Sequence, residues 1–325
     1  MNVNELEYTY AVARIRALEA SLLTDSVIDQ LLACKDEAQC LGLLSEKGWG
    51  NAETENDVEA ILNCEEEKTW QVIQEVSPDL TVFDVMSYPK LYHNLKAAIK
   101  EVCTEVINEK IFYDDCEIPG KEMLSIVENK AFERLPGNME AAAKEAYETL
   151  LQTRDGQLCD VIVDRAALEA ITQAGHDAKD EIIRVYAEST VALANIKIAV
   201  RCQKTGKSLE FMKRAMAPCE SINVEQLAKA ALSGADALRE YLKETVYADG
   251  VEALEESPSA FERWCDNRMI EAIKPQKYNA FSAGPLVAYL LARQNEIKTV
   301  RMILTGKQNG FPDEMIRERI REMYV

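Results

Sequence analysis

Histidine, the side chain that most often transfers protons or binds metal ions near neutral pH, is almost absent from this sequence. The chain holds two histidines, His93 and His176. His176 is followed by Asp177, as in metal-dependent phosphohydrolases of the HD type, but those sites need several histidines, and the H-E-x-x-H zinc motif is absent. We therefore expect His176 and Asp177 to start a helix at the surface, and we predict no metal site.

Two other short patterns have the residue types of a catalytic motif without its setting. The segment Gly206–Ser208 (Gly-Lys-Ser) matches the end of a phosphate-binding loop, yet Arg201 stands where the first glycine should be. A predicted helix also precedes this segment where a strand is required. Asp114 and Asp115 lack the further aspartate of helical isoprenoid enzymes. Since no pair of carboxylates stands out for acid–base work either, we predict no nucleotide site, no cofactor and no catalytic residue.

Cysteine is the remaining residue type that can act as a nucleophile or a metal ligand. Nine cysteines are scattered along the chain without a C-x-x-C pair, at Cys34, Cys40, Cys64, Cys103, Cys116, Cys159, Cys202, Cys219 and Cys265. An odd number without close pairs is typical of free thiols in a reducing cytoplasm, and tetrahedral metal sites usually show close ligand pairs. We predict free thiols that pack as small apolar residues, with no disulfide framework.

Composition narrows the classes of partner. The chain has 325 residues, a net charge of −19 and a pI near 4.7. Because such a surface repels phosphate backbones and anionic lipids, we predict no nucleic acid partner and no direct electrostatic binding to a membrane, whereas a basic or apolar protein partner stays open. The first residues do not look like a signal peptide, and no stretch reaches the roughly 18 uninterrupted apolar residues of a membrane span.

The elements that carry these residues are predicted to be long helices. Apolar residues make up 47% of the chain, and only 13 glycines and 9 prolines interrupt it. No convincing strand pattern is present, so we predict an all-α fold. The clearest helix should start at Gly284 and Pro285, where proline fits the first turn, and end after about 20 residues at Gly306, because glycine adopts the left-handed cap without strain.

Three further helical stretches are predicted. A long helix should follow the breaker Pro89 over residues 90–110, and another should cover residues 177–202 and end at Gly206. Residues 53–67 hold seven acids and no base, which we interpret as the solvated face of a helix.

The long helices contain three similar sequence segments. They are HNLKAAIK (93–100), ANIKIAVR (194–201) and NEIKTVRM (295–302). Within them Lys96, Lys197 and Lys298 follow one another at intervals of 101 residues. An asparagine stands before each lysine and a second base stands after it.

A second pair of matching segments supports a sequence repeat. The segment DRAALEAI (164–171) matches DNRMIEAI (266–273) at an offset of 102 residues. A period near 100 residues is too long for a stacked solenoid. We therefore predict three similar helical-bundle domains, covering residues 1–112, 113–207 and 208–325.

The repeated bases and asparagines are the candidate partner-binding residues. A base near the end of a helix can also simply complement the helix dipole and keep an exposed face soluble, and this alternative stays open. The candidate set joins the repeated residues with one further arginine: Asn94, Lys96, Lys100, Asn195, Lys197, Arg201, Arg293, Asn295, Lys298 and Arg301.

The last helical segment also resembles a known family. Residues 284–320 resemble the C-terminal signature of the C subunit of V-type and archaeal A-type ATPases, a family that includes the d subunit of the eukaryotic V-ATPase. The family pattern P-x-x-x-Y-Φ-Φ-x-x-x-x-E-Φ-x-x-Φ-R is met by Pro285, Tyr289, Glu296, Val300 and Arg301. The segment YTYAVARIRALEASLL (8–23) is similar to the family's N-terminal helix.

The resemblance implies three helical domains that form a funnel around a pseudo-threefold axis. It implies a non-catalytic rotor subunit at the cytoplasmic face of the membrane, a socket between the central-shaft subunits (D and F type) and the proteolipid rotor ring, and so a protein that touches the membrane only through the ring. The negative surface could complement basic parts of the shaft or ring. An unrelated helical adaptor and a helical enzyme with an acidic site remain as alternatives.

Overall fold

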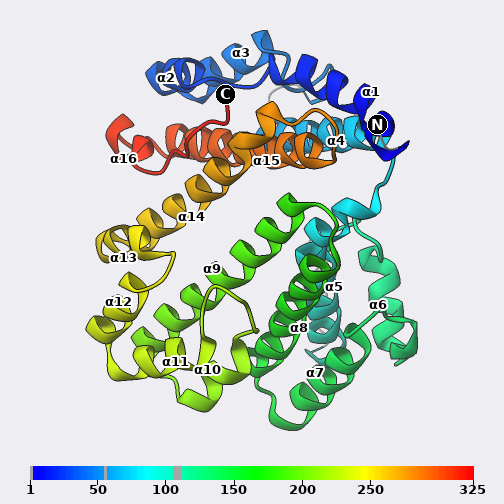
Figure 1. Cartoon of the computed structure of the whole chain (residues 1–325), viewed down its shortest axis with the longest axis vertical. Coiled ribbons are helices and arrows are strands. Elements are labelled where there is room, and N and C mark those ends of the chain that lie inside the picture. Colours follow the sequence, from blue (N-terminus) through cyan, green and yellow to red (C-terminus); the bar gives the residue numbers. More distant parts are fainter. Residues whose placement is uncertain (1–2, 55–56, 105–110) are drawn as a thin grey trace. The chain divides into compact units, whose positions relative to one another are not determined.

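The computed structural model describes residues 3–54, 57–104 and 111–325, and in these residues all regular secondary structure is helical (Figure 1). The all-α prediction is therefore confirmed. The α-helices are α1 (Val3–Glu19), α2 (Asp25–Ala33), α3 (Glu37–Glu46), α4 (Val58–Val76), α5 (Asp84–Thr104), α6 (Gly120–Glu128), α7 (Met139–Thr153), α8 (Gly156–Asp177), α9 (Glu181–Thr205), α10 (Leu209–Ala215), α11 (Val224–Ser233), α12 (Ala235–Lys243), α13 (Val251–Glu256), α14 (Pro258–Ile273), α15 (Gly284–Gln308) and α16 (Asp313–Arg317). Short 3₁₀ turns are η1 (Thr81–Phe83), η3 (Phe132–Arg134), η4 (Ala248–Gly250) and η5 (Lys274–Tyr278).

The chain forms two compact units. The first takes the described residues of Met1–Thr81 together with Asp180–Ile183 and Gly250–Val325, and the second takes those of Val82–Lys179 together with Arg184–Asp249. Both ends of the sequence thus contribute to the first unit. The division into three repeat domains stays a prediction.

The first unit is built around α15. This helix lies alongside α4 and also packs against α1, α3 and α14 (Figure 1). Its apolar residues Ile297, Val300 and Ile303 join Leu31 of α2 and Leu62 of α4 in one buried core. Because α15 is covered on several sides, nearly all its residues from Gly284 to Ile297 are buried, and only Gln294 among them is exposed.

The second unit has its core between α5, α6, α7 and α8. Leu95 and Ile99 of α5 pack with Met123 of α6, Met139 of α7 and Val163 of α8, all with almost no exposed surface. This packing follows from the helical spacing of apolar residues on each element.

The end of α15 differs from the prediction. Gly306 does not stop the helix, which runs on to Gln308. Gly310 takes the left-handed conformation instead, with φ of 64°, and the N–H of Phe311 donates to the carbonyl oxygen of Gly306 at 2.9 Å. Glycine is needed at 306 for another reason: a Cβ there would lie 2.6 Å from Cγ1 of Ile316.

Two other boundaries are corrected. Pro89 lies inside α5, which begins at Asp84, so this proline does not precede the helix. It removes one intrahelical hydrogen bond near the helix start, and the apolar face that continues across it into the core keeps the helix together. The predicted end near residue 110 lies outside the described residues. His176 and Asp177 end α8 and do not start a helix, whereas Gly206 ends α9 as predicted, with φ of 63°.

Candidate functional site

The repeated asparagines of the second unit are buried and bind the backbone. The amide nitrogen of Asn94 donates to the carbonyl oxygen of Tyr113 at 2.7 Å, and its oxygen accepts from the Tyr113 N–H at 2.9 Å. Asn195 does the same with Ala217, at 2.7 and 3.1 Å. Both asparagine side chains are fully buried. Each one therefore holds the segment that follows its long helix.

Three further hydrogen bonds are donated by the asparagines of the repeated segments. The amide nitrogen of Asn94 donates to the sulfur of Cys116 at 3.3 Å, and that of Asn195 donates to the sulfur of Cys219 at 3.6 Å. In the first unit, the amide nitrogen of Asn295 donates to a later backbone oxygen, that of Glu322, at 2.9 Å. These contacts give the three asparagines an internal role.

Two of the repeated lysines pair with the echoed aspartates. Lys96 lies 2.7 Å from Oδ1 of Asp164, and Lys298 lies 2.5 Å from Oδ2 of Asp266. These aspartates open the two segments that match at an offset of 102 residues. The two pairs do not occupy equivalent places in the sequence, because Asp164 follows Lys96 by 68 residues whereas Asp266 precedes Lys298 by 32.

The remaining repeated bases fall into two groups. Lys100 pairs with Asp160 at 2.6 Å, and Arg301 pairs with Glu59. The side chains of Lys197 and Arg201, one turn apart on α9, make no hydrogen bond or ion pair with any other described residue. Within the described part of the chain, these two repeated bases are the ones left available to a partner.

Arg293, by contrast, is buried. Its guanidinium contacts Oε2 of Glu65 at 2.6 Å and Oε2 of Glu296 at 2.5 Å, and it stacks over the ring of Trp49 at 5.1 Å. Only 7% of Arg293 is exposed. It belongs to a buried ion cluster between α4 and α15, which we call the Arg293 cluster (Arg293, Glu65, Glu296).

The carboxylates of this cluster are also bound by the backbone and by a lysine. Glu296 accepts a hydrogen bond from the N–H of Leu23 at 2.5 Å, and Glu65 accepts from the N–H of Gly50 at 2.9 Å and pairs with Lys68 at 2.7 Å. Burial raises the pKa of Glu296 to about 7, against the opposing effect of the Arg293 charge. The cluster thus fixes α15 against α4 and the loops beside it.

Sequence reasoning missed the acids of this cluster. Glu65 lies in the acid-rich run 53–67, for which the charge pattern predicts a solvated face, yet only 4% of this residue is exposed. The signal was its position: Glu65 follows Ile61 and Leu62 by four and three residues, so it lies on their buried face. Glu59, in the same run, does lie at the surface, where it pairs with Arg301.

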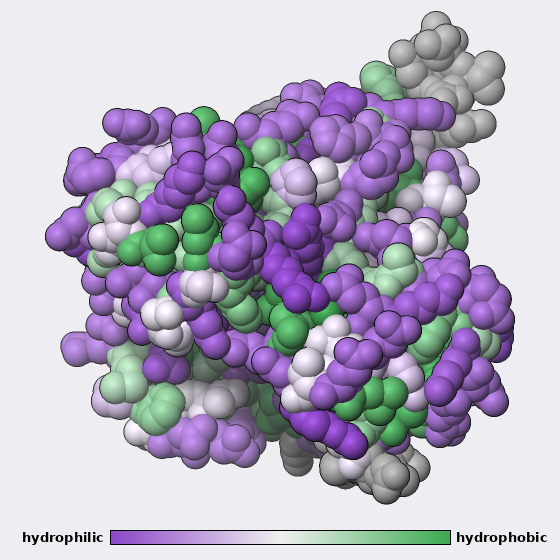
Figure 2. Space-filling model, turned by 90° about the horizontal axis from the view of Figure 1, so that it is seen from below, coloured by the Kyte–Doolittle hydropathy of each residue, from purple (hydrophilic) through white to green (hydrophobic). Residues whose placement is uncertain are grey.

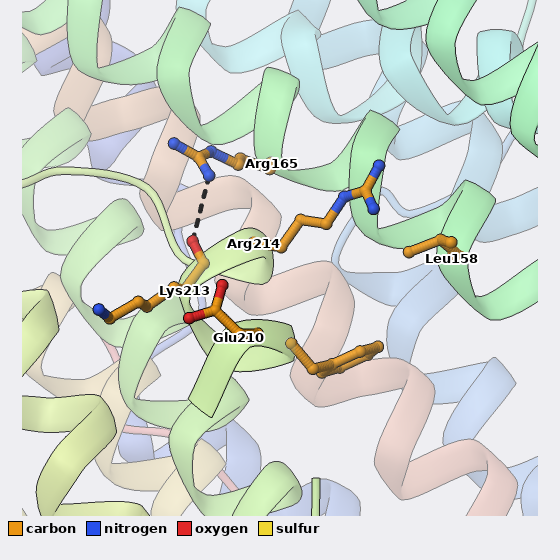
Figure 3. Close-up of a pocket in the computed structure, with 6 residues that line it drawn as sticks. Leu158, Arg165, Glu210, Lys213 and Arg214 are labelled. Carbon is orange, nitrogen blue, oxygen red and sulfur yellow. Dashed lines mark hydrogen bonds between the residues drawn. The ribbon is translucent and has the colours of Figure 1, made fainter. Parts of the chain in front are cut away.

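A hollow of about 510 Å³ lies in the second unit, between α8 and α10 (Figure 3). It is lined by Leu158, Arg165, Glu210, Phe211, Lys213 and Arg214. Nη1 of Arg165 donates to the backbone oxygen of Lys213 at 3.1 Å, as Figure 3 shows. Arg165 pairs with Glu169 at 2.8 Å and Arg214 pairs with Glu145 at 2.5 Å. Because these arginines already have acidic partners, the hollow has little excess positive charge with which to hold an anion.

The described residues contain no group of three or more histidine, cysteine or acidic side chains arranged to hold a metal ion. No helix among them is both long and apolar enough to cross a membrane. The face of the molecule in Figure 2 is mostly hydrophilic, with apolar residues in small separate groups.

Comparison with known proteins gives a consistent result. The family model described as ATP synthase (C/AC39) subunit matches residues 11–319. The C subunit of the V-type sodium ATPase of Enterococcus hirae is 23% identical over 98% of this chain and 99% of its own length. The C subunit of the A-type ATP synthase of Methanocaldococcus jannaschii is 22% identical over 98% of this chain and 87% of its own length, and that of Haloferax volcanii is 27% identical over 62% and 58%.

Proposed function

Because this chain belongs to the ATP synthase (C/AC39) subunit family, we propose that it is the non-catalytic rotor subunit that joins the central shaft of a V/A-type rotary ATPase to the membrane ring. Family membership confirms the resemblance drawn from the last helix and rules out an unrelated adaptor. In this proposal the partners are the shaft subunits of D and F type and the proteolipid ring. The chain lies on the cytoplasmic face and meets the membrane only through the ring.

The observation that carries the proposal is the extent of the match. The C subunit of a V-type sodium ATPase aligns with 98% of this chain and 99% of its own length. A subunit that passes torque must resist twisting, and it needs contact surfaces more than a reaction centre. The long helices α5, α9 and α15, with 21, 25 and 25 residues, provide such stiff elements. The Arg293 cluster adds buried ion pairs that hold α15 against α4 within the first unit.

The contact surface we propose centres on Lys197 and Arg201. Both bases lack an ion-pair partner among the described residues, although the chain as a whole has a net charge of −19. An acidic patch on the shaft or ring would complement them, while the acidic surface elsewhere would face basic parts of the same partners. The funnel of three domains around a pseudo-threefold axis is part of the same proposal.

Deletion of this subunit tests the role. In inverted membrane vesicles that carry the complex without it, ATP hydrolysis by the head should persist while ATP-driven ion uptake is lost, and adding back the purified chain should restore uptake. Normal ion uptake in its absence would refute the proposal. The enzyme alternative has its own test: saturable turnover of a phosphate substrate with magnesium by the isolated chain would overturn the non-catalytic assignment.

A further inference from the structure

Cys34, directly after α2, and Cys40, in α3, both contact the last turn of α2 through their side chains. The carbonyl oxygen of Leu31 accepts a hydrogen bond from the backbone N–H of Cys34 at 3.2 Å and another from the thiol of Cys40 at 3.3 Å. The Cys34 thiol lies close enough to the Cys40 thiol to raise its pKa. Cys34 further bonds through its sulfur to the carbonyl oxygen of Gln30 at 3.4 Å. Both sulfur atoms therefore lie over the last turn of α2, against the neighbouring carbonyl oxygens of Gln30 and Leu31.

The two thiols differ in access to solvent. Cys40 has none of its surface exposed, whereas Cys34 is half-buried. Burial, with Cys34 as a neighbour, raises the pKa of the Cys40 thiol to about 12. A dissolved oxidant therefore meets Cys34 first, and Cys40 stays beside it as a protonated thiol.

The backbone around the pair is held in place. The ammonium group of Lys307, near the end of α15, donates to the carbonyl oxygens of Leu32 and Cys34 at 2.5 and 2.6 Å and pairs with Asp313 at 2.7 Å. Since the end of α2 is fixed from outside, the sulfur of Cys34 stays near that of Cys40. Proximity then compensates for the low thiolate fraction of Cys40.

We propose that Cys34 and Cys40 form an oxidative modification site, at which hydrogen peroxide converts the two thiols into a reversible disulfide. The thiolate of Cys34 attacks the peroxide, an S–O bond forms as the O–O bond breaks, and the departing hydroxide takes up a proton to leave as water. The thiol of Cys40 then attacks the Cys34 sulfur, loses its proton and displaces a second water as the S–S bond forms. The two thiols supply the two electrons that reduce the peroxide.

Mass spectrometry of the full chain tests this site. The reduced protein is treated with a small excess of hydrogen peroxide, its remaining thiols are blocked with N-ethylmaleimide, and it is digested with trypsin without reductant. Because Lys35 lies between the two cysteines, the disulfide should join two separate tryptic peptides, residues 17–35 and 36–47. The linked pair should appear with peroxide and disappear on treatment with dithiothreitol.

Three variants give the controls, each checked for unchanged helix content by circular dichroism. Cys34→Ser should give no linked peptides, and Cys40→Ser should let a sulfenic acid accumulate at Cys34, where dimedone traps it. Cys103→Ser should leave the linkage intact, because Cys103 and its neighbour Cys159 are both buried in the other unit and take no part in the reaction. The proposal fails if peroxide leaves Cys34 and Cys40 unlinked in the wild-type chain, whether both stay as thiols or Cys34 goes on to a sulfinic acid.

Discussion

Arg293 neutralises two carboxylates that the fold has removed from water. Replacing it with methionine keeps the apolar stem but leaves Glu65 and Glu296 buried without their cation, and removing one partner of a buried pair typically costs about 3–5 kcal/mol. We expect Arg293→Met to lower the free energy of unfolding by that amount in urea denaturation. Arg301→Met is the matched control, because its pair with Glu59 is exposed and should contribute less than about 1 kcal/mol. Equal losses in the two variants would contradict the assignment.

The same cluster should make stability depend on pH through Glu296. Its pKa is raised from 4.5 to about 7 by burial, so between these values the folded protein holds a proton that the unfolded chain has released. This group therefore lowers stability as pH rises from about 4.5 to about 7, by up to about 3 kcal/mol. Glu296→Gln should remove that part of the dependence. The measurement is the free energy of unfolding of both proteins at several pH values across this range; a difference that does not change with pH would disprove it.

At the residue scale, the sequence showed clearly which residue types repeat. It showed less clearly whether their side chains are buried or exposed. Asn94 follows Leu91 by three residues and precedes Ala98 by four, so the helical period itself places it on the buried face of α5. Polarity alone predicts a surface contact for the repeated asparagine, and here the position in the helix decides against it. The burial of Arg293 could not be predicted for a different reason: its acidic partner Glu65 is 228 residues away, a contact that no local pattern contains.

At the element scale, the glycine inside α15 shows how packing can override a local signal. A Cβ at Gly306 would meet Cγ1 of Ile316 at 2.6 Å, whereas a Cβ at Gly42 in α3 would have no neighbour within 4 Å. We expect Gly306→Ala to lower the free energy of unfolding by about 1–3 kcal/mol despite the better helix propensity of alanine. Gly42→Ala, the matched control, should raise it by about 0.5–1 kcal/mol.

A double variant separates the clash from other effects of the Gly306 change. Truncating Ile316 to alanine removes the atoms that the new Cβ would strike, so Gly306→Ala should cost little more in the Ile316→Ala background. Thermal or urea unfolding of the four proteins gives the coupling energy directly. Additive losses would show that Gly306 is not required by this contact.

The long helices were predictable because their signals are local and repeated along the chain. Apolar spacing, the proline start of α15 and the glycine end of α9 each lie within a few residues of the feature they define. Helix ends were predicted less well. Gly306 is a glycine because of its contact with α16, and Pro89 stays inside α5 because that helix packs on the core of the second unit. Sequence alone could not supply those contacts, because both depend on the folded arrangement.

At the scale of the whole molecule, the strong negative charge sets the background against which the contact residues act. The chain has 56 acidic and 37 basic residues, and most of the repeated bases are paired with acids inside it. An internal pair has little attraction left for a partner, so reversing Lys96 should chiefly release Asp164, and reversing Lys298 should leave Asp266 paired with Arg321 alone. The proposed binding role therefore concentrates on α9.

Charge reversal on α9 tests that role in the assembled complex. Lys197→Glu combined with Arg201→Glu should weaken the retention of the chain on the shaft or ring and reduce ATP-driven ion uptake by about tenfold or more, because two like charges now face the proposed acidic patch. Helix content of the isolated chain should not change, since neither base has an ion-pair partner among the described residues. Lys204→Glu, an exposed base near the end of the same helix, is the matched control and should leave uptake almost unchanged.

Raising the salt concentration should weaken retention of the wild-type chain more than that of the double variant, as electrostatic contacts are screened. If the double variant couples normally and both proteins respond alike to salt, α9 is not the contact surface, and the bases serve only to complement the end of their helix.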